Sequence, residues 1–170
     1  PLFMSSIEEK SNSRGKTQKA NELKAFRDER PFAFAPAGEI NGISFINDSA
    51  SVNIEQTAAA LADVSAPVVW IVEANGKHGD LSSLFDLVKT NVKAIVAVGT
   101  AAYEVHDALW KAAKFFTVAG SWDEAIDLSL IVAADGDTVL FSPACRAVEP
   151  FENHKDRGAY FNRLIAVKQI

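Results

Sequence analysis

The sequence is poor in several residue types and patterns, and each shortage narrows the class of protein. Cys145 is the single cysteine among 170 residues, which excludes an internal disulfide and fits a reducing compartment, the cytoplasm. No apolar run reaches the length of a membrane span, and the first residues lack the charged start, apolar core and cleavage site of a signal peptide. The three histidines, at positions 78, 106 and 154, are too far apart for metal-ligand spacing, so no metal site is expected.

The sequence also lacks a large excess of either basic or acidic residues. The net charge is −5 and the isoelectric point is about 5.2, so nothing draws the chain to nucleic acid or to an anionic membrane surface. Hydrophobic residues make up 48% of the chain and charged residues 23%, as in ordinary globular proteins. This length and composition predict one domain with a full core.

The stretch that organises the chain is 43–53, where an apolar strand leads into a polar elbow and then a helix. Its first half alternates and is rich in β-branched and aromatic residues, as strands are. Asn47, Asp48 and Ser49 follow, and side chains of these types bond nearby backbone or cap helices. At the carboxyl end of a parallel sheet such an elbow is where ligands bind.

Strand and helix patterns alternate through the rest of the chain. This alternation predicts an α/β domain with a mostly parallel sheet of about six strands, one of them an antiparallel addition. Residues 1–16 have the composition of a linker. The order of the strands stays open. Strands are expected at 32–40, 43–47, 67–72, 94–98, 115–118 and 138–141, and helices at 17–29, 54–62, 80–90, 101–113, 121–133 and 153–165.

Two glycine-containing segments could hold phosphate. Gly15-Lys16-Thr17 ends like a phosphate loop, but Lys10 stands where that motif needs glycine and no buried strand precedes it, so chance explains the match. The loop 76–80 follows the 67–72 strand and contains Lys77, a cation at a tight turn. A ligand-binding loop and a plain turn remain equal interpretations of it.

Two further segments contain reactive side chains. Cys145 follows the last strand, but no signature supplies a base, and a lone cysteine in such a loop usually packs. The last helix opens at Asn153, a cap by type, and Arg157 is expected to pair with Asp156 or another acid. His154 is expected at the surface and not as a general base.

These segments, in this order, resemble the C-terminal domain of the Mur ligases, most closely those that add D-glutamate to UDP-N-acetylmuramoyl-L-alanine. The match covers about residues 20–167. Its motifs recur in order and spacing. They are Gly38-Glu39-Ile40-Asn41-Gly42, the strand into Ile46-Asn47-Asp48-Ser49, Pro67–Val72 with Gly76-Lys77, Gly136-Asp137-Thr138-Val139-Leu140, Ser142-Pro143-Ala144-Cys145, and Phe151, Asn153 and Asp156-Arg157-Gly158.

The resemblance implies a Rossmann-like three-layer fold and a part in peptidoglycan synthesis. In full-length ligases this domain follows a UDP-binding and an ATPase domain, and it delivers the amino acid whose amine attacks an acyl phosphate. ATP, Mg²⁺, the UDP-linked muramoyl peptide and D-glutamate are the ligands so implied. The phosphate loop belongs to another domain, so this chain is not expected to catalyse the reaction by itself.

Several polar groups of the family pattern are missing at the elbow and after the last strand. The family lysine at the elbow is Ala50 and the threonine that holds the amino acid is Val52. The Ala-Ser pair after the cysteine is Arg146-Ala147, which removes a second substrate hydroxyl. Each lost polar partner weakens binding by roughly 1–3 kcal/mol, so together they are expected to lower affinity roughly 10³-fold.

Other positions also depart from the pattern. Ala33 replaces an arginine beside the nucleotide, Glu73-Ala74 replaces Gly-Gly, and His154 replaces a phenylalanine. The resemblance still assigns Lys77, Ser49 and Asn53 to substrate, and Asp48 (at the ribose) and Asn47 to nucleotide.

Three hypotheses remain open. The chain is part of a divergent ligase, or a non-catalytic interaction module that has lost the ligase site, or, less favoured, a nucleotide-binding domain that uses Asp48. The full coding length and titration with ATP, ADP and D-glutamate separate them.

Overall fold

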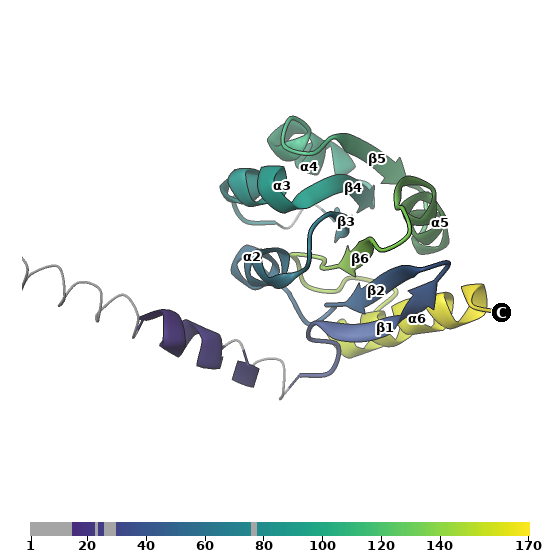
Figure 1. Ribbon diagram of the computed structural model, residues 1–170, viewed down its shortest axis with the longest axis horizontal. Coiled ribbons are helices and arrows are strands. Elements are labelled where there is room, and N and C mark those ends of the chain that lie inside the picture. The colour runs from purple at the N-terminus through teal and green to yellow at the C-terminus, as the bar shows by residue number, and fades with distance from the viewer. Residues whose placement is uncertain (1–14, 23, 26–29, 76–77) are drawn as a thin grey trace, which may run out of the picture.

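The sheet is the centre of the fold. In the computed structural model, which describes residues 15–22, 24–25, 30–75 and 78–170, six strands lie in the order β1-β2-β6-β3-β4-β5 (Figure 1). All neighbouring pairs are parallel except β1 and β2. The strands are β1 (Ala35–Ile40), β2 (Ile43–Asn47), β3 (Val68–Glu73), β4 (Val92–Val98), β5 (Phe115–Ala119) and β6 (Thr138–Phe141).

Helices cover both faces of the sheet, which gives three layers (Figure 1). The apolar side chains of the strands point alternately to the two faces, and each face has its own core. One core lies under α2 (Ile54–Asp63), the 3₁₀ turn η1 (Leu81–Leu84), α3 (Phe85–Asn91) and α4 (Ala102–Leu109). The other lies under α5 (Trp122–Val132) and α6 (His154–Lys168).

The architecture confirms the predicted fold class of a mostly parallel six-stranded α/β sheet with one antiparallel addition. The expected 80–90 helix is divided into η1 and α3, because Asp80 caps a tighter first turn by accepting from the Ser82 backbone N–H. The expected 101–113 helix ends early, at Leu109, where the chain turns toward β5 through a bond from Ala112 N–H to the Leu109 carbonyl. Part of the predicted 17–29 helix, and most of the 1–16 linker, lie outside the described residues.

Side-chain caps fix the helices that begin at the carboxyl ends of strands. Asn53 accepts a hydrogen bond from Gln56 N–H at the start of α2, and Asn153 accepts one from Asp156 N–H at the start of α6. Ser121 caps α5 in the same way. The caps set where each helix leaves the sheet edge, and so where the site lies. Among the described residues no helix is both long and apolar enough to span a membrane.

Candidate functional site

The candidate site lies at the carboxyl ends of β2, β6 and β3, beside the start of α6. Because β6 lies between β2 and β3, it brings together the elbow after β2, the loop 142–147 after β6 and the end of β3. This is the sheet edge at which α/β proteins bind ligands. Two layers are present there: a buried polar network and an open depression above it.

Asp48 is the centre of the first half of the network. Its carboxylate accepts hydrogen bonds from the backbone N–H of Phe34 (2.9 Å) and from the hydroxyls of Ser51 and Ser142 (both 2.6 Å). Ser142 also lies 2.8 Å from the Thr57 hydroxyl. Only 1% of Asp48 is exposed, so the carboxylate joins the β1 entry, the elbow and the end of β6 from inside the protein.

Arg157 is the centre of the second half. Its guanidinium is 1% exposed and pairs with the buried Glu73 carboxylate at 2.5 Å, and it also donates to the Ser49 carbonyl (2.7 Å) and the Cys145 carbonyl (3.0 Å). The other acid that the sequence offered, Asp156, instead accepts from Glu152 N–H. Glu73 therefore has a definite role where the family pattern has glycine: it neutralises the arginine that ties α6 to the sheet edge.

Cys145 belongs to this buried cluster. Burial, with the Glu73 carboxylate beside the sulfur, raises the pKa of the Cys145 thiol well above its usual range. Its Sγ lies 3.4 Å from a Glu73 carboxylate oxygen and 3.2 Å from the Asn75 amide. A thiol held protonated has little nucleophilic character, which agrees with the expectation that Cys145 packs.

Three of the site residues predicted from sequence, Asn47, Asp48 and Ser49, come together in this network. Asn47 donates to the Gly158 carbonyl and the Asn162 side chain, both at 2.9 Å. The Ser49 hydroxyl donates to the His154 carbonyl and accepts from Arg157. Asn53 is exposed at the start of α2, and Lys77 lies outside the described residues. Their roles toward substrate and nucleotide stay predictions.

The elbow is covered by the segment that precedes β1. Ala50, at the family lysine position, is fully buried, and its N–H donates to the Phe32 carbonyl at 3.1 Å. Gly158 in α6 has no side chain where the Phe32 ring lies, and a Cβ there would collide with that ring. The segment therefore packs between the elbow and α6.

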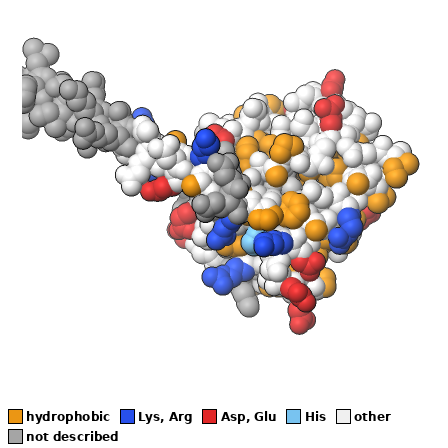
Figure 2. Space-filling view, turned by 90° about the horizontal axis from the view of Figure 1, so that it is seen from below, with side chains coloured by type: hydrophobic (Ala, Val, Ile, Leu, Met, Phe, Trp, Pro, Cys, Tyr) orange, Lys and Arg blue, Asp and Glu red, His pale blue; other side chains and the backbone are white. Residues whose placement is uncertain are grey.

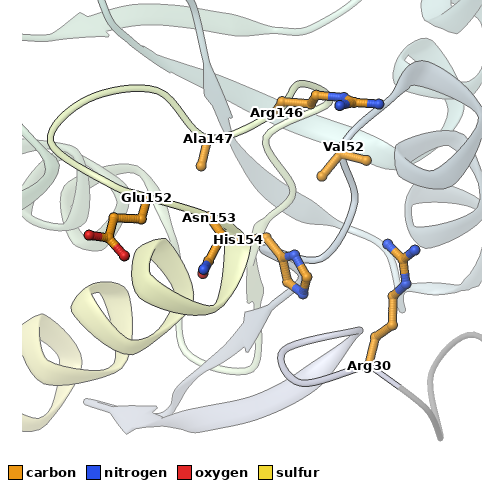
Figure 3. Close-up of a pocket in the computed structure, with 7 residues that line it drawn as sticks. All are labelled: Arg30, Val52, Arg146, Ala147, Glu152, Asn153 and His154. Carbon is orange, nitrogen blue, oxygen red and sulfur yellow. The ribbon is translucent and has the colours of Figure 1, made fainter.

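Above the network lies an open depression of about 490 Å³, lined from four segments of the chain (Figure 3). Val52 comes from the elbow, Ala147 from the loop after β6 and His154 from the start of α6. The resemblance assigned the first two of these positions to the amino-acid substrate, and at the third it noted only that histidine replaces a phenylalanine. Figure 3 also shows the two arginines reaching toward the Val52 side, while Glu152 points away from it. The lining residues are Arg30, Val52, Arg146, Ala147, Glu152, Asn153 and His154.

Two arginines and one glutamate line the depression, and further cations lie beside His154. Burial, then the nearby charges of Arg30, Arg157 and Lys155, lowers the pKa of His154 below its ordinary value of 6.5. The imidazole is therefore neutral near pH 7, and its Nε2 is buried with no hydrogen-bond partner in the structure. His154 lies half-buried at the rim of the depression, whereas the sequence analysis expected it at the surface.

Two features of the site escaped sequence analysis. Arg30 was not singled out, because nothing in its local pattern marks it. The pairing of Glu73 with Arg157 joins residues 84 positions apart, although the Gly-Gly departure at 73–74 was a usable signal. No group of three or more metal-ligating side chains occurs in the part of the chain that the structure describes.

Comparison with known proteins identifies relatives of one kind. The chain is 36% identical over 143 residues to the UDP-N-acetylmuramoylalanine–D-glutamate ligase of Cytophaga hutchinsonii. The matched residues cover 84% of this chain and 32% of that protein. The same enzymes of Desulfitobacterium hafniense (36%, 75% of this chain) and Chlamydia pneumoniae (33%, 78%) also match. The chain spans only 28–32% of the length of these curated relatives. No family model matches.

Solved structures with the same fold include two ligases. A MurF ligase from Thermotoga maritima in complex with ADP superimposes with a TM-score of 0.53 over 82% of this chain and 31% of that one. Folylpolyglutamate synthase from Mycobacterium tuberculosis, complexed with ADP, gives 0.55 over 79% of this chain and 32% of that one. At 13% and 12% identity these likenesses establish the fold alone.

Proposed function

We propose that this chain, homologous to the C-terminal domain of the D-glutamate-adding Mur ligases and of the same fold, presents an amino acid to the chemistry of a ligase. The observation that carries the proposal is the depression itself. Positions 52 and 147 are far apart in sequence, are assigned to the amino-acid substrate by resemblance, and line one cavity at the carboxyl edge of the sheet. Unrelated surface residues would have no reason to converge there.

The domain is proposed to depend on other domains for catalysis. Asn47 and Asp48, assigned to nucleotide by resemblance, are buried and hydrogen-bonded within the protein. The elbow offers the methyl group of Ala50 where the family has a cation. These residues do not fit a separate nucleotide site, so ATP and Mg²⁺ would be held by other parts of an intact ligase, together with the UDP-linked muramoyl peptide.

Under this proposal the protein acts in peptidoglycan synthesis in the cytoplasm, with D-glutamate as the amino acid. Support comes from the UDP-N-acetylmuramoylalanine–D-glutamate ligases to which the chain is 33–36% identical. The chain itself would position the amino acid. The hydrogen bonds of Arg157 and Asp48 hold α6 and the elbow, and so they hold the residues that line the depression in place.

The alternative function is a non-catalytic interaction module on the same scaffold. The observation that favours it is the loss of two substrate hydroxyls, at Val52 and Ala147, from the lining of the depression. A module of this kind would keep the core and the buried network and would have no affinity for amino acids.

Calorimetric titration of the chain with D-glutamate separates the two. The ligase-domain proposal predicts weak but saturable binding, strengthened in the double variant Val52→Thr/Ala147→Ser, which restores both hydroxyls. Absence of binding in both proteins would refute it and favour the module. A full coding length near three times this chain would independently support the ligase, and the chain alone should not hydrolyse ATP.

A further inference from the structure

We infer that the depression is an oxyanion-binding site in which the guanidinium of Arg146 holds the acidic group of a small ligand. The inference rests on the proposed function, since it names the chemistry of that ligand, but it uses a residue for which the family pattern has alanine. The ligand group is a carboxylate or a phosphate, two oxyanions that a planar guanidinium can bind with paired hydrogen bonds.

The backbone beneath Arg146 is fixed. The Cys145 carbonyl accepts from the buried Arg157 guanidinium at 3.0 Å, and the Arg146 carbonyl accepts from the Asn75 amide at 3.2 Å. The Arg146 side chain is exposed and has no hydrogen bond or ion pair with any residue that the structure describes. A backbone that is already held by hydrogen bonds loses little conformational entropy when a ligand binds to its side chain. Arg146 combines such a backbone with a guanidinium that has no partner among the described residues, which suits ligand binding.

The surroundings of Arg146 are also arranged for an anion. Arg30 and His154 line the same depression, and Figure 3 shows Arg30, Arg146 and the imidazole directed around the space beside Val52. In the space-filling view lysine or arginine side chains lie beside a histidine, with acidic side chains close by (Figure 2). The one acid in the lining, Glu152, points away from this space (Figure 3). Two arginines and a single acid therefore line this depression on a chain of net charge −5.

The depression also contains polar groups that a ligand could complete. His154 Nε2 is buried and lacks a partner, which is unusual for a buried polar atom. Asn153 caps α6, so the backbone N–H groups of the first turn point toward this edge of the domain and favour negative charge. A volume of about 490 Å³ accommodates a ligand of amino-acid size.

Titration calorimetry on the full chain tests the inference, with D-glutamate, its neutral analogue D-glutamine, and inorganic phosphate as probes. We expect D-glutamate to bind more tightly than D-glutamine, Arg146→Ala to weaken D-glutamate about tenfold or more, and Arg146→Lys to recover part of the loss. Arg163→Ala removes an exposed arginine from α6 outside the depression, so it is the matched control and should leave the affinity within twofold. Thermal unfolding of each variant verifies that it folds.

The outcomes distinguish the inference from the proposed function. Binding of D-glutamate that is unchanged in Arg146→Ala overturns the inference and leaves the proposed function standing. Arg146-dependent binding of phosphate without D-glutamate supports the oxyanion site and refutes the amino-acid function. If neither probe binds the wild-type chain, the inference is overturned.

Discussion

The buried network and the depression above it lie in the same corner of the molecule but follow different rules. In the network every charge has a partner: Arg157 has Glu73, and Asp48 has two hydroxyls and a backbone N–H. In the depression Arg146 has no partner among the described residues and His154 Nε2 has none either. The comparison teaches that the network maintains the fold, whereas two groups of the lining, the Arg146 guanidinium and His154 Nε2, take no part in holding the described residues together.

The largest expected effect comes from breaking the buried ion pair. Arg157→Met leaves the Glu73 carboxylate buried without its partner, which should lower the free energy of unfolding by about 3–5 kcal/mol. Urea denaturation measures the loss. Arg157→Met/Glu73→Leu, which removes both charges, should recover much of it, and Arg163→Met on the exposed face of α6 should cost less than about 0.5 kcal/mol. A single variant as stable as wild type would show that the network is not structural.

Asp48→Ala should come next. It leaves the Ser51 and Ser142 hydroxyls and the Phe34 N–H without their acceptor, so a loss of about 2–4 kcal/mol is expected from unsatisfied buried groups. Asp48→Asn keeps an acceptor oxygen and should lose less. Equal losses in the two variants would contradict the hydrogen-bond account, again judged by urea denaturation.

Removing the caps should have an intermediate effect at the boundary between the regions. Asn153→Ala removes the acceptor for Asp156 N–H and should cost about 1 kcal/mol, as should Asn53→Ala at α2. Thermal or urea unfolding gives both values. If Asn153→Ala also weakened anion binding while Asn53→Ala did not, the start of α6 would be tied to the ligand site.

A smaller effect is expected from pH. Because the pKa of His154 is lowered in the folded protein by burial and by neighbouring cations, the unfolded chain binds the proton more readily. The stability from this group is present above pH 6.5 and is lost as the pH falls through the folded pKa. His154→Gln should flatten the fall in stability measured by urea denaturation between pH 7 and pH 5. An unchanged slope would exclude His154 as its source.

The smallest expected effect on stability is that of Arg146→Ala. An exposed side chain without partners contributes little, so the free energy of unfolding should change by less than about 0.5 kcal/mol. Urea denaturation of Arg146→Ala and Arg157→Met, measured side by side, compares the free energy of unfolding contributed by an arginine of the depression with that contributed by an arginine of the network. A loss above about 1 kcal/mol would mean that Arg146 belongs to the structural network.

The fold was predictable because its signals are local. The apolar run Pro67–Val72 indicated a strand buried on both faces, which is β3, and the Asn and Ser caps at 53, 121 and 153 marked where helices begin. The order of strands was not predictable, since nothing in the β6 sequence states that it lies between β2 and β3.

The site was predictable only in part, for the same reason. Resemblance placed Val52 and Ala147 at the amino-acid substrate, and the structure has both lining one depression. The partner of Arg157 and the contribution of Arg30 depend on pairs of residues brought together by the sheet, which no spacing along the chain reveals.

The central position of β6 has a consequence for how the protein is made. The strand between β2 and β3 is the last of the six to leave the ribosome, so the two halves of the sheet stay apart until residue 141 has been synthesised. Contacts between segments so distant in sequence slow folding. Until then the facing edges of β2 and β3 are open to other chains, which makes a translation product truncated before Thr138 prone to aggregation.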